Sequence, residues 1–581
     1  MSEFRVWAPK PALVRLDVDG AVHPMARSDD GWWHANIDAP PQARYGYLLD
    51  DDPTVLPDPR SPRQPDGVHA RSQLWDPAGA TWTDGDWPGR SIGGAAGAVI
   101  YELHVGTFTG AGTFDSAVEK LDYLVDLGID FVELMPVNSF SGTHGWGYDG
   151  VLWYSVHEPY GGPDGLVRFV DACHASGLGV LIDAVFNHFG PSGNYLPRFG
   201  PYLSSASNQW GEGINIADAD SDEVRRYIIG CALRWMRDFH ADGLRLDAVH
   251  ALVDTTAISI LEELATETDW LASQLGRPLS LIAESDLNDP RLITPRDRNG
   301  YGLTAQWSDD IHHAIHTAVS GERQGYYADF GSLATLAETL RHGYFHAGTY
   351  SPFRHRRHGR RLDTTEKSGT PATRLVAYTC THDQVGNRAL GDRPSQNLTG
   401  GQLAVKAAVA LGSPYTAMLF MGEEWGASAP FQFFSSHPEP ELARATVEGR
   451  KAEFADHGWN ADDIPDPQDP QTFLRSKLNW DESGAGEHAR LLALYRDLIA
   501  LRRTETDLAD PWLEHLVVDY DEDERWITVH RGGLRIACNL GADPVTVPVA
   551  GDVVLAWGEP KVDADSTVLE GHSFVILRVA D

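Results

Sequence analysis

Short apolar runs that alternate with amphipathic segments dominate the central part of the chain. Eight such runs are rich in Val, Ile, Leu and aromatic residues, and each ends at a loop or helix signal. Because strand and helix patterns alternate through all eight, they predict an α/β fold with a closed (β/α)8 TIM barrel. The predicted barrel strands are residues 98–105, 129–137, 178–186, 243–249, 279–284, 303–309, 375–383 and 415–422.

The two ends of the chain have a different pattern, in which short strand-like runs are separated by turn residues. At the front these runs predict an Ig-like β-sandwich module over residues 1–90. After residue 505 strand patterns return, which predicts an antiparallel C-terminal β domain over 506–581. The barrel with its inserted loops then spans 91–505, and the helical segment 491–503 should close it. The N-terminal strands are expected at residues 4–9, 14–20, 32–37 and 44–50.

The length and charge of the chain narrow its class. A chain of 581 residues is too long for one ordinary domain. The net charge of −36 disfavours nucleic acid and anionic membranes as partners. The sequence has no apolar run of about 18 residues, and its start resembles no signal peptide, so we expect a cytoplasmic protein. The basic stretch 354–361 (RHRRHGRR) is favoured as a solvated mobile loop, with contact to a substrate or partner left open.

Cysteines and N-terminal tryptophans point to packing more than to chemistry. Cys173, Cys231, Cys380 and Cys538 are far apart in apolar contexts, without a CxxC or zinc-type spacing. We therefore expect buried free thiols in a reducing compartment. The pair Trp32–Trp33 is favoured as core or interface aromatics, with a sugar-binding platform as the alternative.

Three acidic residues lie at the ends of separate predicted barrel strands. Asp247 is in GLRLDAV, Glu284 ends LSLIAE, and Asp383 ends LVAYTCTHD. Acids at the carboxyl ends of several parallel strands build the catalytic site of a TIM barrel. Paired carboxylates are also what glycoside cleavage needs. A single acid of this kind could simply cap a loop or form a salt bridge, but three together favour catalysis.

Arg245, two positions before Asp247, supports different catalytic roles for the three acids. Arg245 and Asp247 share one face of their strand, because side chains two apart point the same way. An arginine beside a carboxylate keeps it ionised, as a glycosidic nucleophile requires. Glu284 ends the next strand, and a neighbouring anionic Asp should raise its pKa, which suits a general acid. Asp383 comes from across the barrel mouth and is expected to orient sugar hydroxyls.

Histidines accompany the acids at the strand ends. His188, His250 and His382 follow the third, fourth and seventh predicted strands. They permit a zinc site, but no compact ligand spacing supports one. We therefore predict no metal or other cofactor in catalysis, and leave a structural calcium ion open.

Four segments together resemble the conserved regions of the α-amylase superfamily of glycoside hydrolases. They are DAVFNH (183–188), GLRLDAVH (243–250), IAESD around Glu284, and THD (381–383). The resemblance implies that Asp247 is the nucleophile, Glu284 the acid/base and Asp383 the stabiliser of the transition state. It also implies glucose contacts for His188, Arg245, His250 and His382, a stacking role for Tyr148, and support from below by Asp183 and Asn187.

A narrower resemblance covers nearly the whole chain. ELHVGTFT (102–109), AQWSDDIHHAIH (305–316), HDQVGNRA (382–389) and MGEEWGASAPFQFF (421–434) are similar to the maltooligosyltrehalose trehalohydrolase family. That family is similar in having a β module, a barrel and a C-terminal β domain. One departure is ESDLND (284–289), where a more charged EDDRND-like run is expected.

This resemblance implies a retaining glycoside hydrolase that cleaves the α-1,4-glucosidic bond next to the terminal trehalose of maltooligosyl trehalose. It further implies a role in trehalose biosynthesis and a functional link to maltooligosyltrehalose synthase. A glycogen branching or debranching enzyme is the alternative within the superfamily. A non-catalytic glucan-binding protein is the alternative from another class, although such a protein need not keep all three acids.

Specificity for trehalose is expected to come from the loops after strands six, seven and eight. A 1,1 linkage hides the reducing end and turns the second ring, so only the leaving-group side of the site can sense it. Asp309 and Asp310 could alternatively cap a helix that begins near Ile311. Trp425 and Phe431 are predicted as groove walls. The other predicted substrate contacts are Leu246, Ala248, Val249, Asp309, Asp310, Ile311, His312, His313, Gln384, Val385, Gly386 and Asn387.

Overall fold

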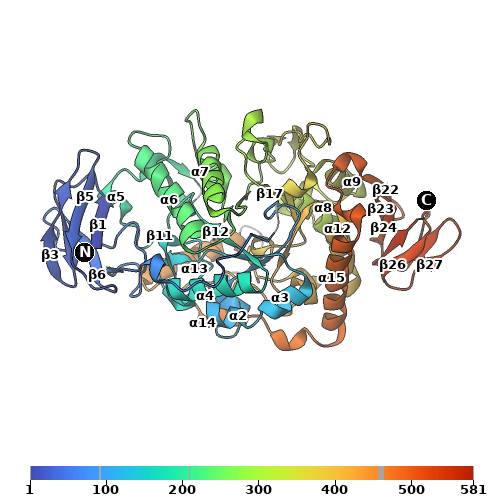
Figure 1. Ribbon diagram of the computed structural model, residues 1–581. Helices are drawn as coiled ribbons and strands as arrows, with labels where there is room; N and C mark the ends of the chain where they lie inside the picture. Colours follow the sequence, from blue (N-terminus) through green and yellow to red (C-terminus); the bar gives the residue numbers. More distant parts are fainter. Residues whose placement is uncertain (1, 91–92, 209, 456–462, 580–581) are drawn as a thin grey trace.

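The computed structural model describes residues 2–90, 93–208, 210–455 and 463–579. Figure 1 shows three parts in a row, with the N-terminal strands at one end, the barrel in the middle and the C-terminal strands at the other end. Among the described residues, no helix is both long and apolar enough to cross a membrane.

The N-terminal part consists of two small antiparallel sheets. One has the order β1-β5-β4 and the other β3-β2-β6-β7. Trp33 is buried and its indole N–H donates to the carbonyl of Ala8 at 3.0 Å. Trp32 lies under the guanidinium of Arg60, 4.9 Å from its ring centroid. Both tryptophans therefore serve packing, as predicted. The strands are β1 (Ser2–Trp7), β2 (Val14–Val18), β3 (Ala21–Pro24), β4 (Ala26–Arg27), β5 (Trp32–Ile37), β6 (Arg44–Leu49) and β7 (Ser72–Gln73).

Eight parallel strands close into a barrel, which confirms the predicted architecture. The strand order around the barrel follows the chain, so each strand pairs with its sequence neighbours and the last pairs with the first. The barrel strands are β8 (Val99–Leu103), β9 (Phe131–Leu134), β12 (Gly179–Ala184), β15 (Gly243–Leu246), β16 (Ser280–Ala283), β17 (Ala305–Trp307), β20 (Leu375–Tyr378) and β21 (Thr416–Phe420).

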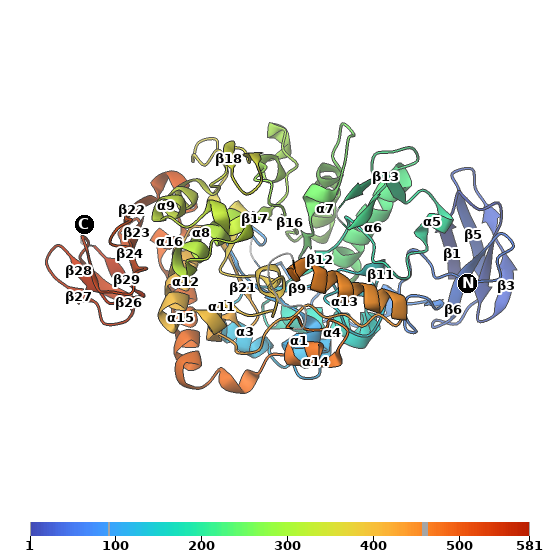
Figure 2. The ribbon, with the colours of Figure 1, turned by 180° about the vertical axis from the view of Figure 1, so that it is seen from behind.

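Helices surround the barrel, and their sequences carry their own end signals. Thr399 caps one helix through its side chain, and Gly276 and Gly321 end two others in the left-handed conformation that glycine adopts without strain. Figure 2 shows a further helix, α13, in the long segment after β21. The main helices are α3 (Leu121–Leu127), α4 (Gly162–Ala175), α6 (Asp222–Asp238), α7 (Ile260–Leu275), α8 (Asp309–Ser320), α9 (Leu333–His342), α12 (Gly400–Gly412), α13 (Pro440–Ala455) and α15 (Gly486–Thr504).

The seventh barrel strand is shorter than predicted. It ends at Tyr378, and the short helix α10 (His382–Gly386) begins four residues later. Thr381 caps this helix, with its hydroxyl oxygen accepting from the N–H of Asp383 at 3.2 Å. Asp383 therefore lies in the first turn of a helix rather than at a strand end. Thr381 and Gln384 form a capping box, which starts a helix at a point where the apolar run predicted that the strand continues.

The C-terminal part packs two antiparallel sheets after α15. Their orders are β22-β23-β24-β29-β26 and β25-β28-β27. Because α15 ends at Thr504, we propose a domain boundary near residue 505, and another near residue 90, before the barrel begins. The strands are β22 (Val517–Asp521), β23 (Trp526–Arg531), β24 (Leu534–Asn539), β25 (Val545–Val547), β26 (Asp552–Trp557), β27 (Lys561–Val562), β28 (Thr567–Leu569) and β29 (Ser573–Arg578).

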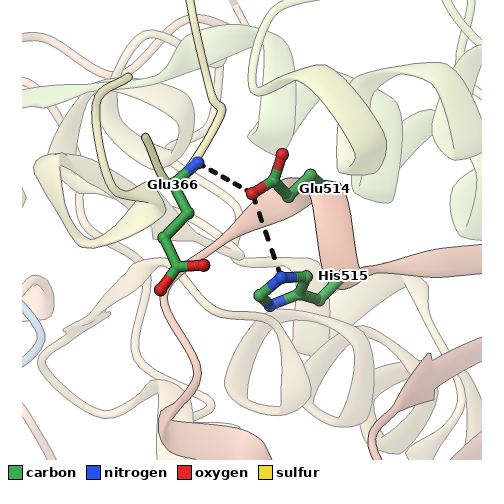
Figure 3. Close-up of side chains that lie close together, drawn as sticks. All are labelled: Glu366, Glu514 and His515. Atoms are coloured by element: carbon green, nitrogen blue, oxygen red, sulfur yellow. Dashed lines mark hydrogen bonds and ion pairs between the residues drawn. The ribbon is translucent and has the colours of Figure 1, made fainter. Parts of the chain in front are cut away.

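A loop of the barrel is tied to the start of the C-terminal part. Figure 3 shows Glu366, Glu514 and His515 side by side, with the N–H of Glu366 donating to Glu514 Oε1 at 2.9 Å. His515 also pairs with Asp510 at 2.7 Å. The hydrogen bond from Glu366 to Glu514 therefore joins surfaces of two parts of the chain, and the Asp510–His515 pair lies beside it.

The four cysteines are buried and unpaired, as predicted. Cys173 and Cys231 lie on helices that pack against the barrel, and Cys538 lies on β24. Cys380 follows β20, and burial raises its pKa well above the ordinary thiol value. These thiols therefore behave as small apolar side chains.

A buried ionic cluster closes the end of the barrel opposite the strand ends that carry the acids. His174 Nδ1 is 2.7 Å from Asp84, and its Nε2 is 3.0 Å from Asp242. Asp84 also pairs with His240 at 2.8 Å, and Arg277 pairs with Asp242 at 2.7 Å. Burial lowers the pKa of His174, but the two carboxylates outweigh it and raise the pKa above its ordinary value. The cluster holds the segment before the barrel against the beginnings of β12 and β15.

This cluster predicts a pH-dependent stability. A histidine whose pKa is raised on folding stabilises the fold fully below its unfolded pKa, about 6.5, and loses that contribution as pH rises through the folded value. His174→Gln should therefore destabilise by about 1–3 kcal/mol near pH 6. The deficit relative to the unmodified protein should shrink toward pH 9. Denaturant unfolding across this range checks it, and a deficit independent of pH would contradict it.

Candidate active site

A cavity of about 890 Å³ opens at the carboxyl ends of the barrel strands. Asp247, Glu284 and Asp383 all line it, although they come from three separate segments. The barrel thus brings together the three acids that the sequence singled out. The cavity is also lined by Trp146, Tyr148, Asp149, His188, Trp210, Ala248, His250, Asp286, Trp307, Asp309, His313, Tyr326, Phe353, Arg354, His382, Gln384, Asn387, Phe433, Thr446, Arg450, Glu453 and Phe454.

Asp247 follows the last residue of β15 and is held from two sides. Arg245 Nη1 donates to its Oδ1 at 2.7 Å, and Asn187 Nδ2 donates to its Oδ2 at 2.7 Å. Asn187 also donates to the backbone carbonyl of Asp247 at 3.0 Å. Both carboxylate oxygens therefore have donors, which fix the side chain where it lines the open cavity.

Arg245 lies below the cavity and is fully buried. Its Nη1 also contacts both oxygens of Asp183, at 2.9 and 2.8 Å, and its Nη2 is 3.8 Å from Glu284 Oε2. Burial lowers the pKa of Arg245, but the surrounding carboxylates, Asp183 first, outweigh it and raise the pKa well above its ordinary value. The predicted sugar contact by Arg245 is thus replaced by a support role, since it does not line the cavity.

Glu284 is one residue beyond β16 and beside Asp247. Its Oε2 accepts from the N–H of Ala248 at 2.5 Å. Burial raises its pKa well above the ordinary carboxyl value, and the charges of Asp247 and Asp383 add to that rise. A carboxyl group that keeps its proton near neutral pH is suited to general acid catalysis.

Ala248, which follows Asp247 in the chain and contacts Glu284, has a strained backbone. Ala248 has φ of 39° and ψ of 52°, in the left-handed region that non-glycine residues rarely adopt. This conformation directs its N–H to Glu284 Oε2. The chain thus turns sharply after Asp247, and the backbone of Ala248 connects Asp247 to the carboxyl group of Glu284. Strained backbone positions are often found next to reactive groups.

Asp383 approaches from α10 and is the most exposed of the three acids, with 40% of its side chain accessible. Asn387 Nδ2 donates to its Oδ1 at 3.2 Å, and His382 Nε2 lies 3.5 Å from the same oxygen. Gln384 contributes to the helix cap, since its Oε1 accepts from the N–H of Thr381 at 2.8 Å. The carboxylate thus comes to the cavity from the segment after β20, three barrel strands after the strand that precedes Asp247.

Tyr148 and His382 form a stacked pair at the cavity floor. Their ring centroids are 5.2 Å apart, with an angle of 23° between the planes. The Tyr148 hydroxyl donates to Asp183 Oδ2 at 2.5 Å. Burial raises the pKa of Asp183 to about 6, and Arg245 opposes that rise. Asp183 and Asn187 lie beneath the cavity and hold residues that line it, in line with the resemblance.

Two further predicted histidines also line the cavity. His188 stacks on Trp210, with centroids 5.5 Å apart, and its Nδ1 is 2.5 Å from Asn187 Oδ1. His250 follows Val249 in a short helical turn. Among the described residues, the group whose geometry would suit a metal ion is Glu366, Glu514 and His515. These three are exposed, and none of them lines the cavity.

Several predicted contacts lie away from the cavity. Asp310 is turned from it, because its Oδ2 accepts from Asn288 at 2.8 Å and from the N–H groups of Phe345 and His346 at 2.9 Å each. Trp425 and Phe431 are fully buried in the core and form no groove wall. A one-residue step on α8 turns each side chain by about 100°, so a run of neighbours cannot all face one cavity. The remaining predicted contacts that do not line it are Leu246, Val249, Ile311, His312, Val385 and Gly386.

Asp309 and His313, one turn apart on α8, do line the cavity. The Tyr378 hydroxyl donates to Asp309 Oδ1 at 2.5 Å. Burial raises the pKa of Asp309 to about 7, and burial lowers the pKa of His313 to about 4. The helix begins at Asp309, with Ser308 at the N-cap position, so Asp309 and Asp310 are its first two residues rather than caps before Ile311. The side chain of Asp309 still reaches the cavity.

Sequence reasoning missed most of the outer wall. Arg354, from the basic stretch, pairs with Asp286 at 2.9 Å and lines the cavity. Its neighbour Phe353 contributes an exposed aromatic ring. Arg450 comes from α13, which no apolar periodicity marked as part of the site. The exposed aromatic beside a basic run was the one available signal, and it was interpreted as a solvated loop.

Comparisons with known proteins agree with this geometry. Residues 84–210 match the model of the alpha amylase catalytic domain, and residues 511–576 match a domain of unknown function, DUF3459. A malto-oligosyltrehalose trehalohydrolase of Mycobacterium tuberculosis is 79% identical over 100% of both chains. The enzyme of the same name from Saccharolobus solfataricus is 38% identical over 95% of this chain and 93% of its own.

Two solved structures and a more distant relative show how far the similarity of this chain to known proteins extends. A crystal structure from Salmonella typhimurium, named provisionally as an alpha amylase, has 39% identity and a TM-score of 0.90 over 100% of this chain and 97% of its own. A group B streptococcal pullulanase in complex with maltotetraose shares the fold, with a TM-score of 0.73 and 16% identity, over 100% of this chain and 86% of its own. A 1,4-alpha-glucan branching enzyme of Xanthomonas campestris is 28% identical over only 58% of this chain and 52% of its own.

The position of Asp247 predicts a large effect on turnover. Asp247→Ala should fold normally and lose kcat by roughly 10³-fold or more, because a covalent route would be removed. Asp115→Ala, which removes an exposed carboxylate paired with Arg168, is the matched control and should leave kcat unchanged. Steady-state kinetics with both variants decide the point. Retention of more than about a tenth of kcat, an effect under 1.4 kcal/mol, would exclude the nucleophile role.

Proposed function

Because the chain belongs to the malto-oligosyltrehalose trehalohydrolase family, we propose that it hydrolyses the α-1,4-glucosidic bond next to the terminal trehalose of maltooligosyl trehalose. The products are trehalose and a maltooligosaccharide shortened by that unit. The observation that carries the proposal is the acid pair Asp247 and Glu284, held by the buried Arg245 at the floor of a cavity of about 890 Å³.

In the proposed mechanism the two acids divide the chemistry. Glu284, whose pKa burial raises, gives its proton to the oxygen that leaves with trehalose, while Asp247 attacks the anomeric carbon. Water then resolves the glycosyl-enzyme, with Glu284 acting as the base. Asp383 binds hydroxyls of the ring being cleaved, and its charge stabilises the oxocarbenium-like transition state.

Supporting residues hold the sugar at the point of cleavage. Tyr148 offers a ring for stacking, and His188 and His250 face the same space. Asp309, His313, Gln384 and Asn387 line the cavity and are proposed to contact the trehalose unit. Hydrogen bonds to trehalose hydroxyls would reject maltose at the same end, because the polar groups of the site would be left unpaired.

The branching and debranching alternatives have weaker support. The named branching enzyme matches only part of the chain at low identity, whereas trehalohydrolases match over its whole length. A non-catalytic glucan-binding protein has no need of a protonated acid placed beside an ionised one. We further propose, from the chemistry of the substrate, that maltooligosyltrehalose synthase supplies it in a route of trehalose biosynthesis. The cytoplasmic location stays a prediction.

Product analysis tests the proposal directly. Maltotriosyl trehalose should give trehalose and maltotriose, because the site is expected to cleave only beside the trehalose unit. Maltopentaose should be cleaved much more slowly, and glycogen should gain no new branches. Chromatography of the three digests distinguishes the outcomes. Equal rates on maltotriosyl trehalose and maltopentaose would contradict the specificity, and new α-1,6 linkages in glycogen would favour the branching alternative.

The stereochemistry of the product tests the roles of the two acids. A retaining pair should hold its carboxyl groups about 5–5.5 Å apart, and an inverting pair roughly 6.5–9.5 Å apart. We therefore expect the maltooligosaccharide to leave first as its α-anomer. Proton NMR within the first minutes of the reaction detects it before mutarotation. An initial β-anomer would replace the covalent mechanism with a direct attack by water.

A further inference from the structure

A carboxylate that no part of the proposed mechanism uses lies directly under the active site. Glu102, on β8, is 1% exposed and does not line the cavity. One of its oxygens is hydrogen-bonded to Nδ1 of His382, and the other accepts from the backbone N–H of His382 at 3.0 Å. A single side chain thus fixes both the ring and the backbone of one residue, across 280 positions of sequence.

The hydrogen bonds around His382 determine how many protons its ring carries. Nδ1 faces a carboxylate oxygen, which can only accept, so Nδ1 must carry a proton. Nε2 is 2.8 Å from the Tyr148 hydroxyl, whose one proton is donated to Asp183. The hydroxyl oxygen is therefore an acceptor, so Nε2 also carries a proton. This arrangement of partners points to an imidazolium ring.

The charged surroundings of His382 agree with this assignment. Burial lowers the pKa of His382, but Asp383 and Glu102 outweigh it and raise the pKa to about 9. Arg245 opposes that rise. Burial raises the pKa of Glu133 well above its ordinary value and lowers the pKa of His104 to about 3. The titratable groups that face His382 are Glu102, His104, Glu133, Tyr148, Asp183, Arg245 and Asp383.

We propose that Glu102 is a positioning residue for the hydrolysis: it keeps His382 doubly protonated and aims its Nε2–H between the Tyr148 hydroxyl and the Asp383 carboxylate. The imidazolium holds the Tyr148 ring in place for stacking and keeps a positive charge 3.5 Å from Asp383. Without Glu102 the ring would lose its Nδ1 partner and would be free to turn over. The catalytic part of this inference rests on the proposed function, whereas the protonation state does not.

The protonation state of His382 is tested on the unmodified protein without substrate. In protein with 15N-labelled histidine, the His382 signals are those that His382→Asn removes. Both nitrogens should have the shifts of protonated nitrogen at pH 7.5, with the Nδ1 proton far downfield. A neutral tautomer at that pH overturns the proposal. This result is independent of what the enzyme hydrolyses, so it separates this inference from the proposed function.

Glu102→Gln tests the positioning role, with Glu133→Gln as its matched control. Glu133 pairs with Glu102 across β8 and β9, is equally buried, and makes no hydrogen bond to His382. Loss of a carboxylate that orients a metal-bound histidine costs roughly 10–100-fold in activity, and we expect a loss of the same order here. Glu102→Gln should lower kcat/KM by that amount at pH 8, and by less near pH 5.5, where His382 regains its proton. Glu133→Gln should stay within about twofold at both pH values.

Nitrogen shifts of His382 in each folded variant complete the test, because the activity profile also carries the proton of Glu284. In Glu102→Gln the ring should become neutral by pH 7.5, and in Glu133→Gln it should stay doubly protonated. Equal, pH-independent losses in both variants would assign Glu102 a structural role only and overturn the proposal. If Glu102→Gln does not fold, the nitrogen shifts of His382 in the unmodified protein at pH 7.5 still decide whether the ring is doubly protonated, and a neutral ring overturns the proposal.

Discussion

The buried guanidinium of Arg245 is the interaction on which the site depends. A fully buried cation is tolerated only with carboxylates in contact, and here Asp183 and Asp247 meet the same nitrogen while Glu284 lies 3.8 Å from the other. The Trp307 ring covers the guanidinium from another side, 4.3 Å from its centroid. Three neighbouring strands are thereby locked in register at the point where the reacting groups emerge.

The carboxylates around this cation have different surroundings. Asp247 has donors on both oxygens, whereas Glu284 is buried beside other negative charges with one backbone N–H on its Oε2. A nucleophile and an acid can therefore stand side by side in one cavity. The same contrast extends below the site, where Glu102 contacts His382 while burial raises the pKa of Glu133, one strand away, well above its ordinary value. The polar interior of the barrel thus sets the charges at its mouth.

The outer part of the cavity is formed by segments inserted between or after the barrel strands. Arg354 and Phe353 come from the loop between α9 and β20, and Arg450 comes from α13 after β21. Loops on a rigid scaffold are where related enzymes differ in substrate. The full-length match to a trehalohydrolase takes in these segments as well as the barrel.

The amino-acid pattern alone determined the barrel, the flanking β domains and the three acids, because apolar alternation and strand-end acids are local signals. The tertiary structure decided which side chains point into the cavity. Asp310 and Trp425 were expected at the cavity, but a helical turn and a buried core contact direct them elsewhere. Asp383 reaches the site from a capped helix instead of a strand. Glu102 became visible only when folding placed β8 under His382, since no sequence spacing encodes a contact between residues 280 positions apart.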